Sequence, residues 1–231
     1  MKIVMINPNS SKEMTAAIQA AAEKFAEGRF AVQTLATEGA PAFIDYFEDH
    51  AQALPGMIRI IRDYEAEADA FIIACHCDPN LKIMKQITNK PVIGIGEASM
   101  YMAAMLGGRF TVLSTDPHSV PHKQDLIHEY GLDHFCASVR VTDPAIQDQT
   151  LAYIDAGRKA LQEDYAEVIV LGCAGMCELT DALTQALQMP VLDGIICALI
   201  QAEGLVHARL STSKVRLYAP KAPQTDAARM D

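Results

Sequence analysis

Short apolar segments alternate with helical segments along the chain, and this alternation restricts the possible folds more than any other feature. The apolar segments are hydrophobic on both faces, which is typical of parallel strands that helices cover on both sides. The expected strands are 2–6, 30–35, 69–75, 91–95, 110–114, 136–141, 167–173 and 190–192. The expected helices are 12–27, 50–66, 80–88, 97–106, 119–130, 145–164, 178–187 and 194–204. The sequence therefore predicts an α/β fold.

Two of the expected strands are similar to each other. Asp69-Ala-Phe-Ile-Ile-Ala-Cys75 and Glu167-Val-Ile-Val-Leu-Gly-Cys173 both end at a cysteine, and each is followed by a helical segment and a strand that begins at a proline. We interpret this pattern as a weak internal duplication. Ligands of such folds bind beyond the carboxyl ends of the strands. If the two halves face each other, two thiols flank one cleft.

Composition excludes several classes of function. The chain has 231 residues and a net charge of −10. Nucleic-acid binding needs a basic face and anionic membranes attract basic segments, so we expect neither partner. The chain has no apolar run of the roughly 18 residues that a spanning helix needs, and no secretory signal, so we expect a cytoplasmic protein. Its six cysteines are then expected to be reduced thiols.

The two strand-end cysteines are the strongest candidates for catalysis. A cysteine is often only a small buried hydrophobe, but Cys75 and Cys173 occupy matched positions before flexible turns. Backbone N–H groups at such a turn favour the thiolate. One thiolate could remove a proton from an acidic carbon while the opposite thiol delivers a proton to the other face. The turn amides beside Cys75, Ala174 and Gly175 could hold the enolate oxygen, although a plain turn explains Gly175 nearly as well.

Two further cysteines leave a second interpretation open. Cys75, Cys77, Cys173 and Cys177 could together bind zinc, although one residue between the first two is tighter than the usual two to four. Cys77 could also be a bystander, or a target of oxidation beside Cys75. On this interpretation the chain is a metal-binding or redox-sensing module and not an enzyme.

Other candidates stand where expected strands end. Asn9 follows the first strand and could bind a substrate carbonyl or amide, or act as a simple helix cap. Ser114 and Thr115 could hydrogen-bond a substrate oxygen, although a Thr-Asp-Pro turn explains them almost as well. We expect His118 and His122 on a solvated helix start. Three aromatic residues in the loop expected near 38–50 could form a lid or pack in the core: Phe43, Tyr46 and Phe47.

Several motifs occur in a characteristic order over nearly the whole chain. They are Ile6-Asn-Pro-Asn-Ser10, Ala74-Cys-x-x-Asp-Pro79, Pro91-Val-Ile-Gly-Ile-Gly-Glu-Ala98, Leu171-Gly-Cys-Ala-Gly-Met176 and Pro190-Val-x-Asp-Gly194. With these motifs the chain resembles the aspartate/glutamate racemase superfamily, and within it the hydantoin racemase and allantoin racemase branch.

The resemblance implies two α/β lobes related by a pseudo-twofold axis, with the active site between them. It places 1–96 and 206–231 in the first lobe and 97–205 in the second. It implies that a homo-oligomer racemises a small-molecule substrate with two cysteines, without a metal or organic cofactor. It suggests substrate contacts at the first-strand turn, the fifth-strand end and the turns beside each cysteine: Asn9, Ser114, Thr115, His76, Cys77, Ala174 and Gly175.

The chain departs from the family pattern beside its first cysteine. Cys77 stands where the family often has glycine, and His76 stands where an aromatic residue such as phenylalanine is common. Both changes make that wall of the pocket more polar. Our hypothesis is a racemase of a five-membered cyclic ureide, such as a 5-substituted hydantoin or allantoin. An amino-acid racemase, a decarboxylase and a cis–trans isomerase of the same superfamily stay open as alternatives.

Overall fold

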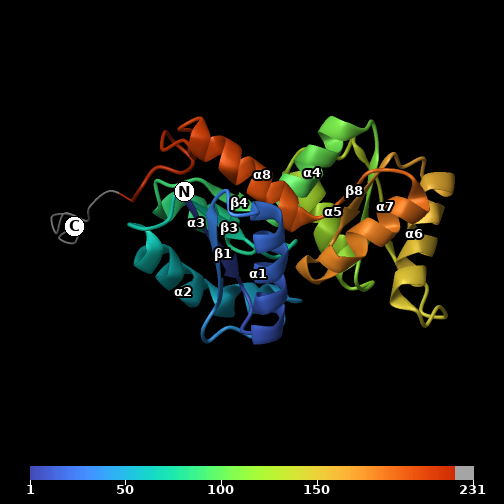
Figure 1. The fold of residues 1–231 in the computed structure, drawn as a ribbon, viewed down its shortest axis with the longest axis horizontal. Coiled ribbons are helices and arrows are strands. Elements are labelled where there is room, and N and C mark those ends of the chain that lie inside the picture. Colours follow the sequence, from blue (N-terminus) through green and yellow to red (C-terminus); the bar gives the residue numbers. More distant parts are fainter. Residues whose placement is uncertain (222–231) are drawn as a thin grey trace, which may run out of the picture.

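The chain folds into two lobes, each built on a four-stranded parallel sheet (Figure 1). The computed structural model describes residues 1–221. The first sheet has the order β2-β1-β3-β4 and the second β6-β5-β7-β8. The strands are β1 (Lys2–Asn7), β2 (Ala31–Ala36), β3 (Ala70–Ile73), β4 (Val92–Gly94), β5 (Phe110–Ser114), β6 (Cys136–Val141), β7 (Val168–Leu171) and β8 (Val191–Leu192). The predicted α/β class with two similar lobes is confirmed.

Helices alternate with these strands, as the sequence pattern predicts. They are α1 (Lys12–Ala26), α2 (Phe47–Tyr64), α3 (Leu81–Ile87), α4 (Ile95–Leu106), α5 (Ser119–Glu129), α6 (Gln149–Glu163), α7 (Thr180–Leu187) and α8 (Gly194–His207). A 3-10 helix, η1 (Ala174–Leu179), occupies the turn after Cys173 and was not predicted. Within residues 1–221, no helix has both the length and the apolar character that crossing a membrane requires.

The two sheets repeat the same geometry at their carboxyl ends. Ile6 of β1 lies opposite Ile73 of β3, and Leu113 of β5 lies opposite Leu171 of β7. Each ladder continues one residue further: the N–H of Ala74 donates to the Ile6 carbonyl at 2.8 Å, and the N–H of Gly172 donates to the Leu113 carbonyl, also at 2.8 Å. The next residue in each lobe is the cysteine. The pairing therefore places the two thiols at equivalent points of the two sheets.

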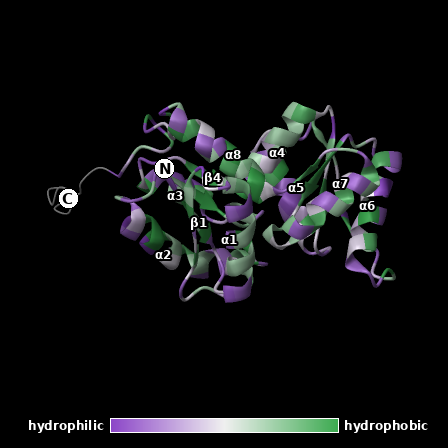
Figure 2. Cartoon of the chain, in the orientation of Figure 1, coloured by the Kyte–Doolittle hydropathy of each residue, from purple (hydrophilic) through white to green (hydrophobic). Residues whose placement is uncertain are grey.

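The central strands β1, β3, β5 and β7 are buried on both faces, which explains why they are largely apolar, whereas the edge strands β2 and β6 are half-buried. In the first sheet, Ile3 and Met5 pack with α1 and α8, whereas Val4 and Ile6 pack with α2 and α3. In the second sheet, one face packs against α4 and α5 and the other against α6 and α7. Figure 2 shows the resulting pattern, with hydrophobic strands inside and hydrophilic helix faces outside.

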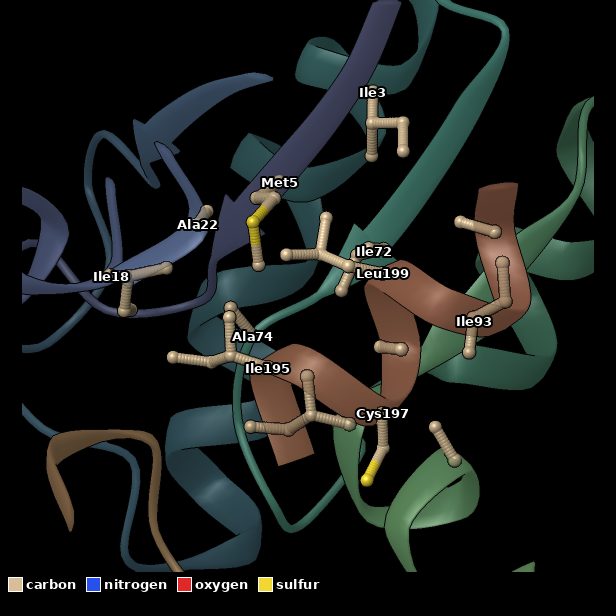
Figure 3. Packing of buried hydrophobic residues seen from close by; sticks show 14 of the residues in the cluster. Ile3, Met5, Ile18, Ala22, Ile72, Ala74, Ile93, Ile195, Cys197 and Leu199 are labelled. Carbon is tan, nitrogen blue, oxygen red and sulfur yellow. The ribbon is translucent and has the colours of Figure 1, made fainter. Parts of the chain in front are cut away.

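Helices α4 and α8 each cover the sheet of the other lobe. Helix α4 follows β4, yet its Met100 packs with Phe110 of the second sheet. Helix α8 follows β8, yet Ile195 and Leu199 pack with Ile72 of the first sheet (Figure 3). Burying each aliphatic side chain contributes about 1.5–3 kcal/mol, so this exchange joins the lobes firmly.

The exchange affects the expected lobe boundaries. The sequence placed residues 97–205 in the second lobe, but α8 begins within that range and packs on the first sheet. We propose that the second lobe ends before Gly194. The chain then runs along the first lobe, where Ser211 Oγ donates to the Asn89 carbonyl at 2.6 Å. Residues 222–231, the end of the expected 206–231 segment, lie outside the described residues.

Candidate active site

A cleft with a volume of about 80 Å³ lies at the carboxyl ends of the strands of both lobes. Each lobe lines it with residues that follow its two central strands. Asn9 comes after β1 and Cys75 after β3, and Thr115 comes after β5 and Cys173 after β7. Parallel strands end at one edge of a sheet, so this is where the fold gathers polar side chains. The two cysteines that the sequence singled out line one cleft.

The Cys173 thiol is buried, and two neighbouring groups stabilise its thiolate form. Burial raises the pKa of the Cys173 thiol, while the backbone N–H of Gly175 and the charge of Lys123 lower it. The net direction is upward, so Cys173 holds its proton at neutral pH. The Gly175 amide thus donates to the sulfur, whereas the sequence suggested that it holds a substrate oxygen. Ala174 lines the cleft, and Gly175 is exposed outside it.

The Cys75 thiol forms a pair with Cys77. Its S–H donates to the Cys77 sulfur, and this bond together with burial raises the pKa of Cys75 well above the ordinary thiol value. The same bond, with help from His122 and Lys123, lowers the pKa of Cys77 to about 3. Of the two sulfurs, Cys77 is therefore the one that favours the thiolate form, and Cys75 is the one that keeps its proton. The N–H of Cys77 also donates to the Cys75 sulfur, as the N–H of Gly175 does to Cys173.

His76 and Lys123 form a buried polar contact in the wall of the cleft. The side chain of His76 is 1% exposed and that of Lys123 is 2% exposed. Lys123 Nζ donates to the Gly172 carbonyl at 2.8 Å and lies 3.3 Å from His76 Nδ1. Burial and the Lys123 charge lower the pKa of His76 well below its usual value. The ring is therefore neutral. Because Lys123 can only donate, the ring proton sits on Nε2, 3.3 Å from Ser99 Oγ.

Asn9 presents an amide group to the cleft. It is 5% exposed, and its Oδ1 accepts hydrogen bonds from Asn7 Nδ2 at 2.8 Å and from the Ser11 N–H at 2.9 Å. Its Nδ2 contacts the weak acceptor Met14 Sδ at 3.1 Å. The two bonds to Oδ1 fix the orientation of the side chain, so Nδ2 is a ready donor for a carbonyl oxygen.

Ser114 and Thr115 are adjacent in sequence but occupy different environments. Ser114 is fully buried, hydrogen-bonds Ser119 and does not line the cleft. Thr115 is exposed in the cleft, where its Oγ1 donates to Asp116 at 3.1 Å. A contact with substrate is therefore open to Thr115 and blocked for Ser114.

Sequence reasoning missed several residues of the cleft. His118 and His122 lie at the start of α5, as expected, with His118 exposed, and both also line the cleft. Lys123, Asp45 and Asp116 line it as well. A signal for Lys123 was present: with Leu126 and Ile127 it forms the buried face of α5, and a lysine on the apolar face of a helix needs a buried partner.

The three aromatic residues of the first-lobe loop lie at the rim. Phe43, Tyr46 and Phe47 are 59%, 60% and 71% exposed, so the core-packing alternative is wrong for them. Phe43 lines the cleft. The Tyr46 ring lies 4.6 Å from the ring of His118, and the Phe47 ring lies 5.0 Å from that of His122. The loop ends earlier than expected because α2 begins at Phe47.

The four-cysteine arrangement is not formed. Cys177 faces a separate hollow beside α1 and Asp193, away from the cleft that holds Cys75 and Cys173. Within residues 1–221, no group of three or more His, Cys, Asp or Glu side chains is arranged to hold a metal ion. The geometry gathers two thiols and their polar neighbours in the cleft and leaves Cys177 out.

Comparison with known proteins agrees with this fold and cleft. A family model described as Asp/Glu/Hydantoin racemase matches residues 3–202. Hydantoin racemase from Pseudomonas sp. (strain NS671) is 38% identical over 226 residues, covering 94% of this chain and 91% of that protein. Hydantoin racemase from Rhizobium meliloti is 39% identical, covering 95% of this chain and 94% of that protein.

A solved structure extends the comparison to three dimensions. Allantoin racemase from Klebsiella pneumoniae superposes with a TM-score of 0.88 at 35% identity, covering 97% of this chain and 95% of that one. The match includes both lobes and therefore the cleft between them. The chain belongs to the Asp/Glu/Hydantoin racemase family and is an isomerase of the racemase type.

Proposed function

We propose that this enzyme racemises a five-membered cyclic ureide, a 5-substituted hydantoin or allantoin, by proton transfer between Cys75 and Cys173. The observation that carries the proposal is the pair of cysteines that follow equivalent central strands and line one cleft. The similar proteins named hydantoin racemase and allantoin racemase support the substrate class.

The reaction exchanges one proton for another at a single carbon. A thiolate on one face removes the C–H proton, and the electron pair is delocalised as an enolate onto the adjacent ring carbonyl. The thiol on the other face then delivers its proton to the same carbon. The configuration is inverted, and the two cysteines have exchanged protonation states. Because only protons move, the chemistry needs neither a metal nor an organic cofactor.

The surroundings of the cysteines support unequal resting states. The Cys75 thiol keeps its proton and donates it to the Cys77 sulfur, and this bond lowers the pKa of Cys77. Cys173 holds its proton, because burial raises its pKa. Transfer of the Cys75 proton to the Cys77 thiolate makes Cys75 the base for one enantiomer, with the protonated Cys173 as the acid on the second lobe. The other enantiomer needs the opposite arrangement.

The polar groups of the cleft suit a ring with carbonyl and N–H groups. Asn9 Nδ2 can donate to a ring carbonyl, and donation to the developing enolate oxygen grows stronger as charge builds up. Thr115 Oγ1 and the Asp116 carboxylate can accept from ring N–H groups. We propose Asn9 and Thr115 as substrate contacts, together with the turn residues that line the cleft: His76, Cys77 and Ala174.

Proton exchange in D₂O tests the proposal directly. Single enantiomers of a 5-substituted hydantoin and of allantoin are incubated with the enzyme, and NMR follows exchange at the acidic carbon while polarimetry follows optical rotation. We expect exchange together with loss of rotation. Such carbons also exchange slowly without enzyme, so a Cys75→Ser, Cys173→Ser double variant sets the background.

The same experiment distinguishes the alternatives. L-Aspartate and L-glutamate are run beside the cyclic substrates, and exchange confined to them would replace the ureide by an acidic amino acid. If a folded enzyme leaves every ureide at background, the proposed substrate class is wrong.

A further inference from the structure

We propose that Lys123 is a positioning residue for both thiols: it links the residue after Cys75 to the residue before Cys173 and places a positive charge in the cleft wall. The inference rests on the proposed function for its role in turnover, but its effect on the thiols can be measured without turnover. It goes beyond the two cysteines, because it concerns how two lobes hold two thiols as one site.

The contacts of Lys123 reach both cysteine turns. Its Nζ donates to the carbonyl of Gly172, directly before Cys173, at 2.8 Å. It also lies 3.3 Å from Nδ1 of His76, directly after Cys75. His76 belongs to the first lobe, whereas Lys123 and Gly172 belong to the second. One side chain therefore fixes the two turns relative to each other.

Burial of the Lys123 ammonium group is unfavourable unless its N–H groups find hydrogen-bond partners. Removing an ammonium group from water is unfavourable unless hydrogen bonds replace the lost hydration, and Lys123 is 2% exposed. An ammonium has three N–H donors, and within residues 1–221 two of them have partners. Lys123 also lines the cleft. Its third N–H is free to stabilise a thiolate or an enolate oxygen.

The charges near the thiols indicate which pKa values a substitution of Lys123 should change. The Lys123 charge lowers the pKa of both Cys173 and Cys77. Besides His76 and the three cysteines, the other titratable groups that line the cleft are Asp45, Asp116, His118 and His122. Cys77 and, to a smaller extent, Asp45 raise the pKa of Cys173 and so oppose Lys123. Removal of the lysine charge should therefore shift thiol reactivity to higher pH.

The test compares Lys123→Met and Lys123→Gln with the wild-type enzyme. Methionine removes the charge and the hydrogen bonds, whereas glutamine keeps a donor for the Gly172 carbonyl and removes only the charge. Lys82→Met is the matched control, because Lys82 is 62% exposed and pairs with Glu129 on the surface. Circular dichroism and thermal unfolding identify which variants fold.

Alkylation by iodoacetamide reports the thiolate of each cysteine. The rate at Cys173 and at Cys77 is followed across pH by peptide mass spectrometry. We expect the Cys173 profile of both Lys123 variants to move up by about one pH unit, which is about tenfold slower alkylation at pH 7. Lys82→Met should match wild type. An unchanged Cys173 profile in a folded Lys123 variant would overturn the proposal.

Activity and alkylation together separate the two proposals. A shifted alkylation profile in an enzyme that leaves all ureides unchanged supports the role of Lys123 at the thiols and refutes the proposed substrate. Racemisation of a ureide with an unshifted alkylation profile supports the proposed substrate and refutes the role of Lys123 at the thiols. In an active enzyme, the acid limb of the kcat/KM profile should move to higher pH for both enantiomers.

A measurement on the wild-type enzyme does not depend on the folding of any variant. Nitrogen-15 NMR of labelled histidine reports the tautomer and protonation state of each ring, and His76→Gln assigns the His76 signal. We expect a neutral His76 ring with its proton on Nε2 throughout the range from pH 5 to 8. A ring that carries its proton on Nδ1 cannot accept from Lys123, and that result would also overturn the proposal.

Discussion

Cys75 and Cys173 follow equivalent strands, and in each case the backbone N–H two residues further along donates to the sulfur. The side chains around the two cysteines differ. Cys75 is followed by His76 and Cys77, which bring a ring and a second sulfur, whereas Cys173 is followed by alanine and glycine. The repeated backbone therefore positions two thiols alike, and the local side chains give them different hydrogen-bond partners.

The residue before each cysteine shows a second difference. Ala74 precedes Cys75, and Gly172 precedes Cys173. A Cβ on Gly172 would lie 2.5 Å from the Leu113 carbonyl oxygen and 3.1 Å from Lys123 Cε. Glycine is needed before Cys173 chiefly because a Cβ there would overlap the Leu113 carbonyl of the neighbouring strand, and Lys123 from α5 adds to the crowding. The asymmetry of the site thus extends into the backbone positions that support it.

The largest effect should come from removing either thiol. Cys75→Ser and Cys173→Ser should each reduce racemisation about 10²- to 10⁴-fold, because a serine hydroxyl is a far weaker acid than a thiol at neutral pH. Each variant should still exchange the proton of one enantiomer with solvent, and the two should differ in which enantiomer. Polarimetry and NMR in D₂O measure the two effects. Full racemisation by either variant would contradict the two-base mechanism.

The next largest effect concerns the glycine before Cys173. Gly172→Ala should destabilise the fold by about 1–3 kcal/mol, because the new methyl group overlaps the Leu113 carbonyl and displaces Lys123. Urea unfolding measures the loss. Gly175→Ala is the control, since its Cβ would meet only Cys173 Sγ, at 3.8 Å. Equal stability of the two variants would show that the crowding at Gly172 has no consequence.

A third prediction concerns Cys77, the additional sulfur beside Cys75. In the wild-type enzyme at pH 6, iodoacetamide should modify Cys77 faster than Cys173, because the pKa of Cys77 is lowered to about 3 while that of Cys173 is raised. In Cys77→Ala the pKa of Cys75 should fall from its raised value, because its sulfur loses the hydrogen bond to Cys77.

Enantiomer-specific rates then reveal whether the asymmetry matters in turnover. The Cys77→Ala substitution should change the pH dependence for the enantiomer that uses Cys75 as the base, and leave the other nearly unchanged. Peptide mass spectrometry measures the alkylation rate of each cysteine, and polarimetry measures the racemisation rate from each enantiomer. If the pH dependence shifts equally for both enantiomers, the pairing of Cys75 with Cys77 does not cause a difference between the two directions of racemisation.

The smallest effect concerns a hydrogen bond near Cys75 that has no counterpart near Cys173. Asp78 stands three residues after Cys75 and accepts from Tyr130 Oη at 2.6 Å, whereas the corresponding residue of the second unit is Met176. Tyr130→Phe should reduce stability by about 1 kcal/mol through loss of this bond. Its effect on racemisation should be small, because Tyr130 does not line the cleft.

The loss in Tyr130→Phe should depend on pH. Burial raises the pKa of Asp78 to about 7, against an unfolded value of about 3.9. The folded chain thus binds this proton more tightly, and the contribution of Asp78 to stability falls as pH rises from about 4 to about 7. The Tyr130 bond lowers the pKa of Asp78, so its removal extends the fall to higher pH. Urea unfolding should show a larger difference from wild type at pH 8 than at pH 5.

Local patterns in the chain were sufficient to predict the fold class and the pair of cysteines. The alternation of apolar strands and helices indicates parallel sheets, because strands covered on both faces must be apolar throughout. The position of a cysteine at a strand end is also local information, since the end of a strand is the edge where ligands bind. Asn9 and Thr115 were found by the same reasoning.

Only the packed structure decided how those residues are surrounded. The exchange of α4 and α8 between the lobes and the contact of Lys123 with both cysteine turns join residues far apart in sequence. Strand and helix patterns carry no information about such partners, because burial of an apolar face does not specify which sheet buries it. The hydrogen bonds to the two sulfurs come from residues close in sequence, Cys77 and Gly175. The burial that raises the pKa of both thiols and the Lys123 charge near Cys173 come from tertiary packing, and these contributions emerged only with the structure.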